Sequence, residues 1–201
     1  MTMKFVLSLL INICNFTTHG PRDDRRPTEW LLSQVIQRKH IEITCGTCSI
    51  MSDEFLEAAG VRSRCVTTLT LDKWNSDDNG HTLIEVLVNG AWAVVDIDQK
   101  CYITDHRGKL VNLRQICAMV QSGKPYHIVP IGKHKVDAEK MRSWYKRVLQ
   151  VPMVMEKRGK AWVIWFTDCA DNKRVASYRH NYKHMPRAEF MKLFYSKEPK
   201  R

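Results

Sequence analysis

The stretch that decides the fold runs from His81 to Asp96 and reads HTLIEVLVNGAWAVVD. Its residues 82–88 alternate between the two sides of an extended chain, which is typical of a strand, and a second short apolar run follows. Asn89 and Gly90 separate the two runs, and Asn-Gly is the strongest short-range signal for a two-residue hairpin turn. A hairpin makes its two ends neighbours. The stretch therefore predicts that His81 and Asp96 lie side by side.

A cysteine precedes this hairpin at the expected start of a helix. Cys48 closes the sequence Cys45-Gly-Thr-Cys, and the helical run after it ends at Gly60. A helix start and a neighbouring imidazolium lower the pKa of a thiol, to about 3.5–7.5 instead of about 8.5. A base and a carboxylate that orients it are what a cysteine nucleophile needs. The sequence predicts Cys48 as nucleophile, His81 as base and Asp96 as orienting carboxylate, with backbone N–H groups for the oxyanion and neither metal nor cofactor.

The spacing of these residues resembles a known family, the bacterial-type transglutaminase-like cysteine domain. The resemblance covers about residues 28–125 and is carried by Gly46-Thr47-Cys48, Ala58-Ala59-Gly60-Val61-Arg62-Ser63-Arg64, His81-x3-Glu85-Val86 and Asn89-Gly90-x-Trp92-x3-Asp96. The region after Asp105 is also similar to some bacterial members. Two features depart from the family pattern. Arg62 stands at a position that is usually proline-like, and the helix that begins at Cys48 is about one turn shorter than in typical members.

The resemblance implies a papain-like α+β fold, in which a cysteine-bearing helix packs on an antiparallel sheet that carries His81 and Asp96. It implies acyl transfer from an amide of a protein or peptide through a thioester, with an amine or water as acceptor. Trp92 is expected to be a packing residue. Some relatives of this fold have lost catalysis, so the alternative is an inactive member that binds a protein or glycan through the old cleft and the basic C-terminal face.

Cys45 supports two other interpretations. Cys-x-x-Cys before a helix is also the redox motif of thioredoxin-like dithiol oxidoreductases, although the Trp and the parallel βαβ context that usually accompany it are missing. Cys45, Cys48, Cys65 and His81 are residue types that bind zinc, without a second closely spaced ligand pair. A further hypothesis is that a Cys45–Cys48 disulfide reversibly caps the nucleophile.

The chain divides into three predicted parts: an N-terminal segment (1–27), a transglutaminase-like core (28–131) and a basic C-terminal extension (132–201). The apolar run that follows Lys4 is either a packed element or an export signal, and it is too short to span a bilayer. Hydrophobic periodicity predicts helices over 28–40, 48–60, 110–121, 136–149 and 187–195, and strands over 65–71, 82–88, 92–95, 126–131, 153–156 and 161–166.

Charge and cysteine content limit the classes of function. The net charge is +11, and residues 173–201 hold nine Lys or Arg against two Glu, a local balance of 9 − 2 = +7. This face is either simply solvated or attracts a polyanionic partner, and no nucleic-acid-binding signature accompanies it. Seven cysteines cannot all pair within one chain. Their scattered spacing favours reduced thiols and a cytoplasmic location over an exported one.

Overall fold

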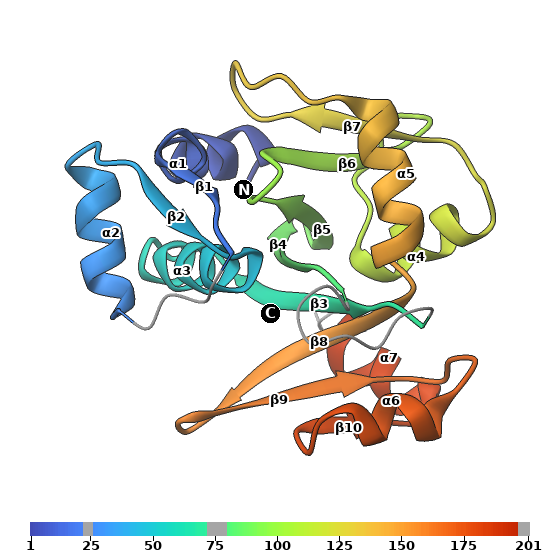
Figure 1. Ribbon diagram of the computed structural model, residues 1–201. Helices are drawn as coiled ribbons and strands as arrows, with labels where there is room; N and C mark the ends of the chain where they lie inside the picture. Colours follow the sequence, from blue (N-terminus) through green and yellow to red (C-terminus); the bar gives the residue numbers. More distant parts are fainter. Residues whose placement is uncertain (22–25, 72–79, 197–201) are drawn as a thin grey trace.

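The computed structural model describes residues 1–21, 26–71 and 80–196. Its largest element is an eight-stranded sheet in the order β10-β9-β8-β3-β4-β5-β6-β7. All neighbours in it are antiparallel except β9 and β10. Helices cover both faces (Figure 1). The fold is therefore of the mixed α+β class, as the sequence predicts.

The elements have the following bounds. The helices are α1 (Met3–Phe16), α2 (Thr28–Ile36), α3 (Cys45–Ala58), α4 (Leu113–Gln121), α5 (Ala138–Val148), α6 (Asn172–Tyr178) and α7 (Arg187–Tyr195). The strands are β1 (Thr17–His19), β2 (Ile41–Ile43), β3 (Ser63–Leu69), β4 (Thr82–Val88), β5 (Ala91–Asp96), β6 (Cys101–Asp105), β7 (Tyr126–Pro130), β8 (Val151–Arg158), β9 (Ala161–Phe166) and β10 (Tyr182–His184). In the described parts of the chain, none of the helices combines the length and the apolar character that crossing a membrane requires.

The predicted hairpin forms as β4 and β5. Asn89 and Gly90 both have positive φ, 50° and 77°, the conformation that a type I′ turn requires. The turn sets the register in which Ile84 faces Val95. Because side chains alternate across a sheet, Ile84 enters the core on one face while Leu83 enters the core on the other.

The first face of the sheet is covered by α1 and α3. The side chains of α1 that enter this core are Val6, Leu10, Ile13 and Cys14. The N-terminal run therefore packs as a helix in the structure. Helix α3 lies against β3 and β4. This is the predicted packing of a cysteine-bearing helix on an antiparallel sheet.

Helix α3 begins earlier than its apolar pattern predicts. The Thr44 hydroxyl accepts a hydrogen bond from the backbone N–H of Thr47, so Thr44 is the N-cap and Cys45 is the first helical residue. The helix stops at Ala58, and Gly60 after it is the left-handed residue predicted to end it, with a φ of +72°. The backbone N–H groups of Gly60 and Val61 bond back to the last turn, which is the Schellman arrangement.

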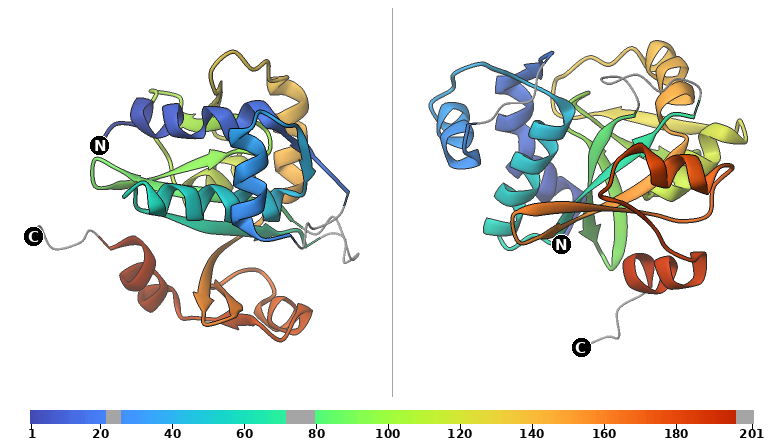
Figure 2. Two further views of the ribbon diagram at one scale, coloured as in Figure 1. Left: turned by 90° about the vertical axis from the view of Figure 1, so that its left-hand side faces the viewer. Right: turned by 60° about the horizontal axis from the view of Figure 1, so that its bottom comes forward.

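The second face of the sheet is covered by α4, α5 and α7, which share one core with the strands. Residues 132–201 also supply β8, β9 and β10, and β8 pairs with β3. The C-terminal elements, orange to red in Figure 2, thus continue the same sheet. The predicted division of the chain into three parts stays a prediction. Part of the predicted basic face, at 197–201, lies outside the described residues. The sequence also predicts polar loops over 20–27 and 72–80, and their residues 22–25 and 72–79 lie outside the described residues as well.

Candidate active site

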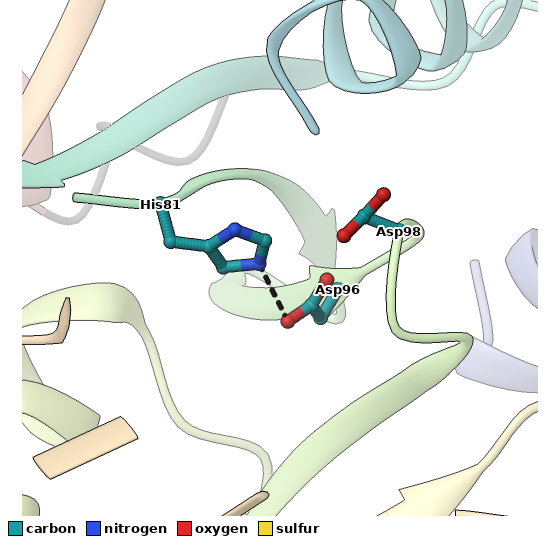
Figure 3. Close-up of side chains that lie close together, drawn as sticks. All are labelled: His81, Asp96 and Asp98. Carbon is teal, nitrogen blue, oxygen red and sulfur yellow. Dashed lines mark hydrogen bonds and ion pairs between the residues drawn. The ribbon is translucent and has the colours of Figure 1, made fainter. Parts of the chain in front are cut away.

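His81 and Asp96 lie together at one end of the hairpin. The imidazole Nε2 of His81 is 2.8 Å from Oδ2 of Asp96 (Figure 3). Both side chains are buried, with exposed fractions of 2% and 0%. The backbone of His81 is fixed to β3, because its N–H donates to the hydroxyl of Thr68 at 3.0 Å. The hairpin thus brings the two residues into contact, as its sequence predicts.

The thiol that interacts with His81 is Cys45 and not Cys48. Burial acts to lower the pKa of His81, but the Asp96 carboxylate and the neighbouring Cys45 thiol outweigh it and raise that pKa well above its usual value. Because Nε2 is bonded to Asp96, Nδ1 is the ring nitrogen left for the thiol. Cys45 is partly exposed and stands at the first position of α3.

Cys48 points into the core, so its predicted place beside His81 is wrong. Cys48 follows Cys45 by about one turn of α3, and its side chain is 1% exposed. Its Sγ lies 4.0 Å from the hydroxyl of Thr17 on β1. Burial raises the pKa of the Cys48 thiol, the opposite of the shift that the sequence predicts. The sequence feature that identifies Cys45 is Thr44, because a threonine that caps the helix makes Cys45 the first residue of α3.

The assignment to Cys45 also removes one departure from the family pattern. Counted from Cys48, the helix to Gly60 is about a turn shorter than in typical members. Counted from Cys45, it is three residues longer, which is close to the 3.6 residues of one turn. The same assignment gives up the match of Gly46-Thr47-Cys48, which ends at Cys48, so it rests on the structure and not on the family pattern.

Helix α5 completes the surroundings of the pair. The sequence predicts this helix, but no pattern in it predicts a place beside His81 and Asp96. The hydroxyl of Tyr145 donates to Oδ2 of Asp96 at 2.7 Å. The ring of Trp144 lies edge-on to the imidazole of His81, with ring centroids 4.6 Å apart. The backbone N–H of Gln99 donates to the other Asp96 oxygen at 3.0 Å. The carboxylate is thus held by three donors, and Trp144 covers the imidazole.

Asp98 is a second buried carboxylate at the site. The donor atoms of His81, Asp96 and Asp98 all lie within 4.8 Å of one another, and this is the one group of potential metal ligands found among the described residues. Asp98 is bonded to His19 of β1, with Nδ1 3.0 Å from Oδ1. No pattern in the sequence marks His19 or Asp98 as a site residue.

The zinc site considered from the sequence does not assemble. The Cys65 thiol donates to Asp53 of α3 at 3.7 Å, and Cys48 faces Thr17. Neither thiol therefore joins His81. Cys45 and Cys48 are both free thiols. The structure leaves the dithiol interpretation and the disulfide cap as predictions.

Most of the remaining motif residues have a structural role. The Arg64 guanidinium bonds to Glu85 at 2.5 Å, and it lies over the ring of Trp92 at 4.1 Å from the centroid. Glu85 also accepts from the hydroxyl of Tyr195 at 3.2 Å. This cluster fastens α7 to β3 and β4. Trp92 is therefore a packing residue, as predicted.

Two cavities lie away from this site. One, of about 360 Å³, is lined by Met119, Val120, Gly123, Lys124, Pro125, Tyr126, His127, Arg142 and Lys146. The other, of about 490 Å³, is lined by Leu71, Arg114, Cys117, Ala118, Gln121, Lys146, Gln150, Val151, Pro152, Thr167, Asp168, Cys169 and Ala170. Neither lining includes a residue of the Cys45, His81 and Asp96 group.

No family model and no curated protein matches the chain. Among solved structures it is similar to arylamine N-acetyltransferase C from Bacillus anthracis, at 12% identity and a TM-score of 0.39 over 83% of this chain and 79% of that one. It is also similar to an arylamine N-acetyltransferase from Bacillus cereus that has a Cys-His-Glu catalytic triad. That match has 10% identity and a TM-score of 0.38 over 84% of this chain and 80% of the other.

Proposed function

We propose that this protein is a cysteine acyl-transfer enzyme in which Cys45 is the nucleophile, His81 the base and Asp96 the carboxylate that orients His81. The observation that carries the proposal is the order of contacts: a thiol at a helix start, then an imidazole, then a buried carboxylate 2.8 Å from the imidazole. A nucleophile, its base and a group that orients the base are the parts that covalent catalysis by a thiol requires.

The contacts assign a role to each group. Asp96 bonds to Nε2 of His81, which leaves Nδ1 to take the proton of the Cys45 thiol. The raised pKa of His81 favours the imidazolium that this transfer creates. The start of α3 adds the partial positive charge of its backbone N–H groups next to the thiolate. The raised pKa of His81 and its place beside the thiol therefore favour transfer of the thiol proton to the imidazole.

Acyl transfer from this pair proceeds in two steps. The thiolate sulfur attacks the carbonyl carbon of an amide or ester, and the imidazolium gives its proton to the leaving group as the C–N or C–O bond breaks. This leaves a thioester on Cys45. An amine or water then attacks the thioester while His81 takes its proton, and the thiolate leaves. The Thr47 N–H is bonded to Thr44, so the N–H groups of Cys45 and Gly46 are the candidate oxyanion donors.

The first test measures the rate of iodoacetamide labelling of each cysteine against pH by mass spectrometry. At about pH 6, Cys45 is expected to label up to about 100-fold faster than an ordinary thiol, because an ordinary thiol is then almost fully protonated. His81→Ala should remove this advantage. Free N-acetylcysteine in the same tube is the ordinary-thiol reference. Cys169 is a partly exposed free thiol whose pKa is raised by burial, and it marks the slow limit within the same molecule.

Cys48→Ala is the matched control for this experiment. Cys48 is buried in the core and is not required for the pair, so the variant should retain fast labelling of Cys45. Labelling of Cys45 at the rate of Cys169 in the parent protein would overturn the proposal and favour the inactive binding module. Retention of fast labelling in His81→Ala would also overturn it.

The second test detects the thioester itself. Incubation with p-nitrophenyl acetate should release p-nitrophenolate and leave one acetyl group on Cys45, seen by mass spectrometry of the intact protein and its peptides. Cys45→Ser should stop both, whereas Cys48→Ala should stop neither. Acetylation spread over lysines, with none on Cys45, would contradict the proposed role of this thiol.

A further inference from the structure

The proposed acyl transfer leaves Asp98 without a role. Its carboxylate is buried beside His81 and Asp96, with the donor atoms of the three residues within 4.8 Å of one another. Figure 3 shows the two carboxylates and the imidazole facing one common space. A Cys-His-Asp site needs one carboxylate to orient its base. The second one requires a separate explanation.

Two carboxylates at this separation repel each other when they are buried, because the protein screens charge less than water does. The nearby cation Lys100 is directed elsewhere, since its Nζ donates to the backbone carbonyls of Cys14, at 2.6 Å, and Thr17. Of the groups bonded to the two carboxylates, the imidazoles of His81 and His19 are the ones that can carry a positive charge. The position between Asp96 and Asp98 is therefore favourable for an added cation.

The carboxylates are also oriented as metal ligands usually are. Gln99 donates to both, from its backbone to Asp96 at 3.0 Å and from Nε2 to Asp98 at 2.7 Å. Tyr145 donates to Asp96 at 2.7 Å, and His19 bonds to Asp98 at 3.0 Å. Hydrogen bonds of this kind fix ligand carboxylates around an ion. The surrounding contacts thus resemble the outer shell of a metal site.

We propose that His81, Asp96 and Asp98 bind a divalent transition-metal ion, with Zn²⁺ as the expected ion, and that the bound ion inhibits the acyl transfer proposed above. One imidazole nitrogen with two carboxylate oxygens suits Zn²⁺, Mn²⁺ or Co²⁺ better than Ca²⁺ or Mg²⁺, which prefer oxygen ligands alone. Cys45 is not a ligand, because it lies toward the other ring nitrogen.

Inhibition follows from the loss of the bond between His81 and Asp96. Metal binding takes the lone pair of Nε2, and the proton shared between Nε2 and Asp96 is released to solvent. The hydrogen bond through which Asp96 orients the imidazole is then replaced by bonds to the ion. Because His81 and Asp96 are both ligands of the ion, neither is available for its role beside Cys45.

The test uses Co²⁺ and Zn²⁺ as the only added ligands, on the full chain after treatment with a chelator. Co²⁺ is expected to bind one per chain and to give visible absorption without the thiolate-to-cobalt charge-transfer band. Cys45→Ser should bind it equally well. Asp98→Asn should weaken binding about 10-fold to 100-fold. The control is Asp168→Asn, which removes the carboxylate of another His–Asp pair, His184–Asp168. This variant should bind Co²⁺ with the affinity of the parent protein.

Labelling of Cys45 at about pH 6 gives the second readout. Zn²⁺ at a concentration that just saturates the parent protein should slow it at least about tenfold. The same concentration should slow it much less in Asp98→Asn, because that variant binds the ion about 10-fold to 100-fold more weakly. Loss of Co²⁺ binding in Cys45→Ser, a thiolate charge-transfer band, or no binding by the parent would overturn the metal site. If Zn²⁺ binds but does not slow labelling, the inhibition is wrong.

The inference rests on the proposed function only for its inhibitory effect, and the two can fail separately. Slow labelling of Cys45 in metal-free protein contradicts the acyl-transfer proposal, whereas the Co²⁺ spectrum still decides the metal site. If the metal-free parent and metal-free Asp98→Asn both label fast and bind Co²⁺ with equal affinity, the metal site is contradicted. The acyl-transfer proposal then still stands. If Asp98→Asn does not fold, the spectra of the parent and of Cys45→Ser decide the question.

Discussion

The hydroxyl of Tyr145 donates a hydrogen bond to the Asp96 carboxylate at 2.7 Å, across 49 positions of sequence. Tyr145 lies on α5, in the predicted C-terminal extension, and its side chain is fully buried. The adjacent Trp144 lies against His81. One helix turn of the C-terminal part therefore contacts both the base of the proposed site and its orienting carboxylate.

Replacement of this tyrosine tests whether the contact orients the site. Tyr145→Phe leaves a buried carboxylate short of one donor, which should lower the free energy of unfolding by about 1.5–3 kcal/mol. We also expect slower labelling of Cys45 by iodoacetamide at about pH 6, because Asp96 is less firmly positioned behind His81. Urea denaturation and mass spectrometry measure the two effects.

Tyr182→Phe is the control. Tyr182 lies on the edge strand β10, and four strands separate β10 from β5, which carries Asp96. It should leave the labelling profile of Cys45 against pH unchanged. If Tyr145→Phe loses stability and keeps the parent labelling profile, the hydrogen bond is structural and does not position the base.

Local signals in the sequence predict the hairpin well. Asn89 and Gly90 occupy the left-handed conformations that their turn type demands, and the alternation beside them fixes the register. The same kind of signal predicts α7 and β9 with their observed bounds. These elements depend on neighbours in the chain, so pattern and turn chemistry are sufficient.

The choice between two cysteines three residues apart depends on where a helix begins. Apolar spacing places the start of α3 near Cys48, whereas the cap at Thr44 places it at Cys45. Contacts such as His19 with Asp98 join residues 79 positions apart. They follow from how α1, β1 and α5 pack on the sheet, and no local pattern carries that information.

The hairpin turn supplies a prediction about stability alone. A Cβ at Gly90 would meet nothing within 4 Å, so Gly90→Ala adds no steric clash. Its φ of 77° is nevertheless costly for a residue with a side chain, by about 1–2 kcal/mol. We expect that loss in urea denaturation with fast labelling of Cys45 retained. Asn89→Gly, which keeps the turn permissive, is the control and should lose much less.

The buried pair of Arg64 and Glu85 should contribute strongly to stability. Glu85 is fully buried, and Arg64 is its charged partner as well as a donor to the backbone carbonyl of Phe194 at 2.7 Å. Arg64→Met leaves an uncompensated buried carboxylate, which should cost about 3–5 kcal/mol in urea denaturation. Lys157→Met breaks the exposed pair with Glu54 and should cost at most about 1 kcal/mol.

A double variant separates the pair from the packing around it. If Arg64→Met with Glu85→Gln is more stable than Arg64→Met alone, the loss comes from the unpaired charge. Equal instability of the two would assign the loss to the contacts of Arg64 with the aromatic rings of Trp92 and Tyr195.

The raised pKa of His81 makes a signed prediction for stability against pH. Because the pKa in the folded protein lies well above the unfolded value of 6.5, the ion pair with Asp96 stabilises the fold fully below that value and loses its contribution as pH rises through the folded pKa. The difference in unfolding free energy between parent and His81→Gln should therefore shrink from about pH 6 to about pH 9. A difference that grows over this range would mean that burial dominates and lowers the pKa of His81. In that case the resting pair would be neutral, and the fast labelling of Cys45 at about pH 6 should be absent as well.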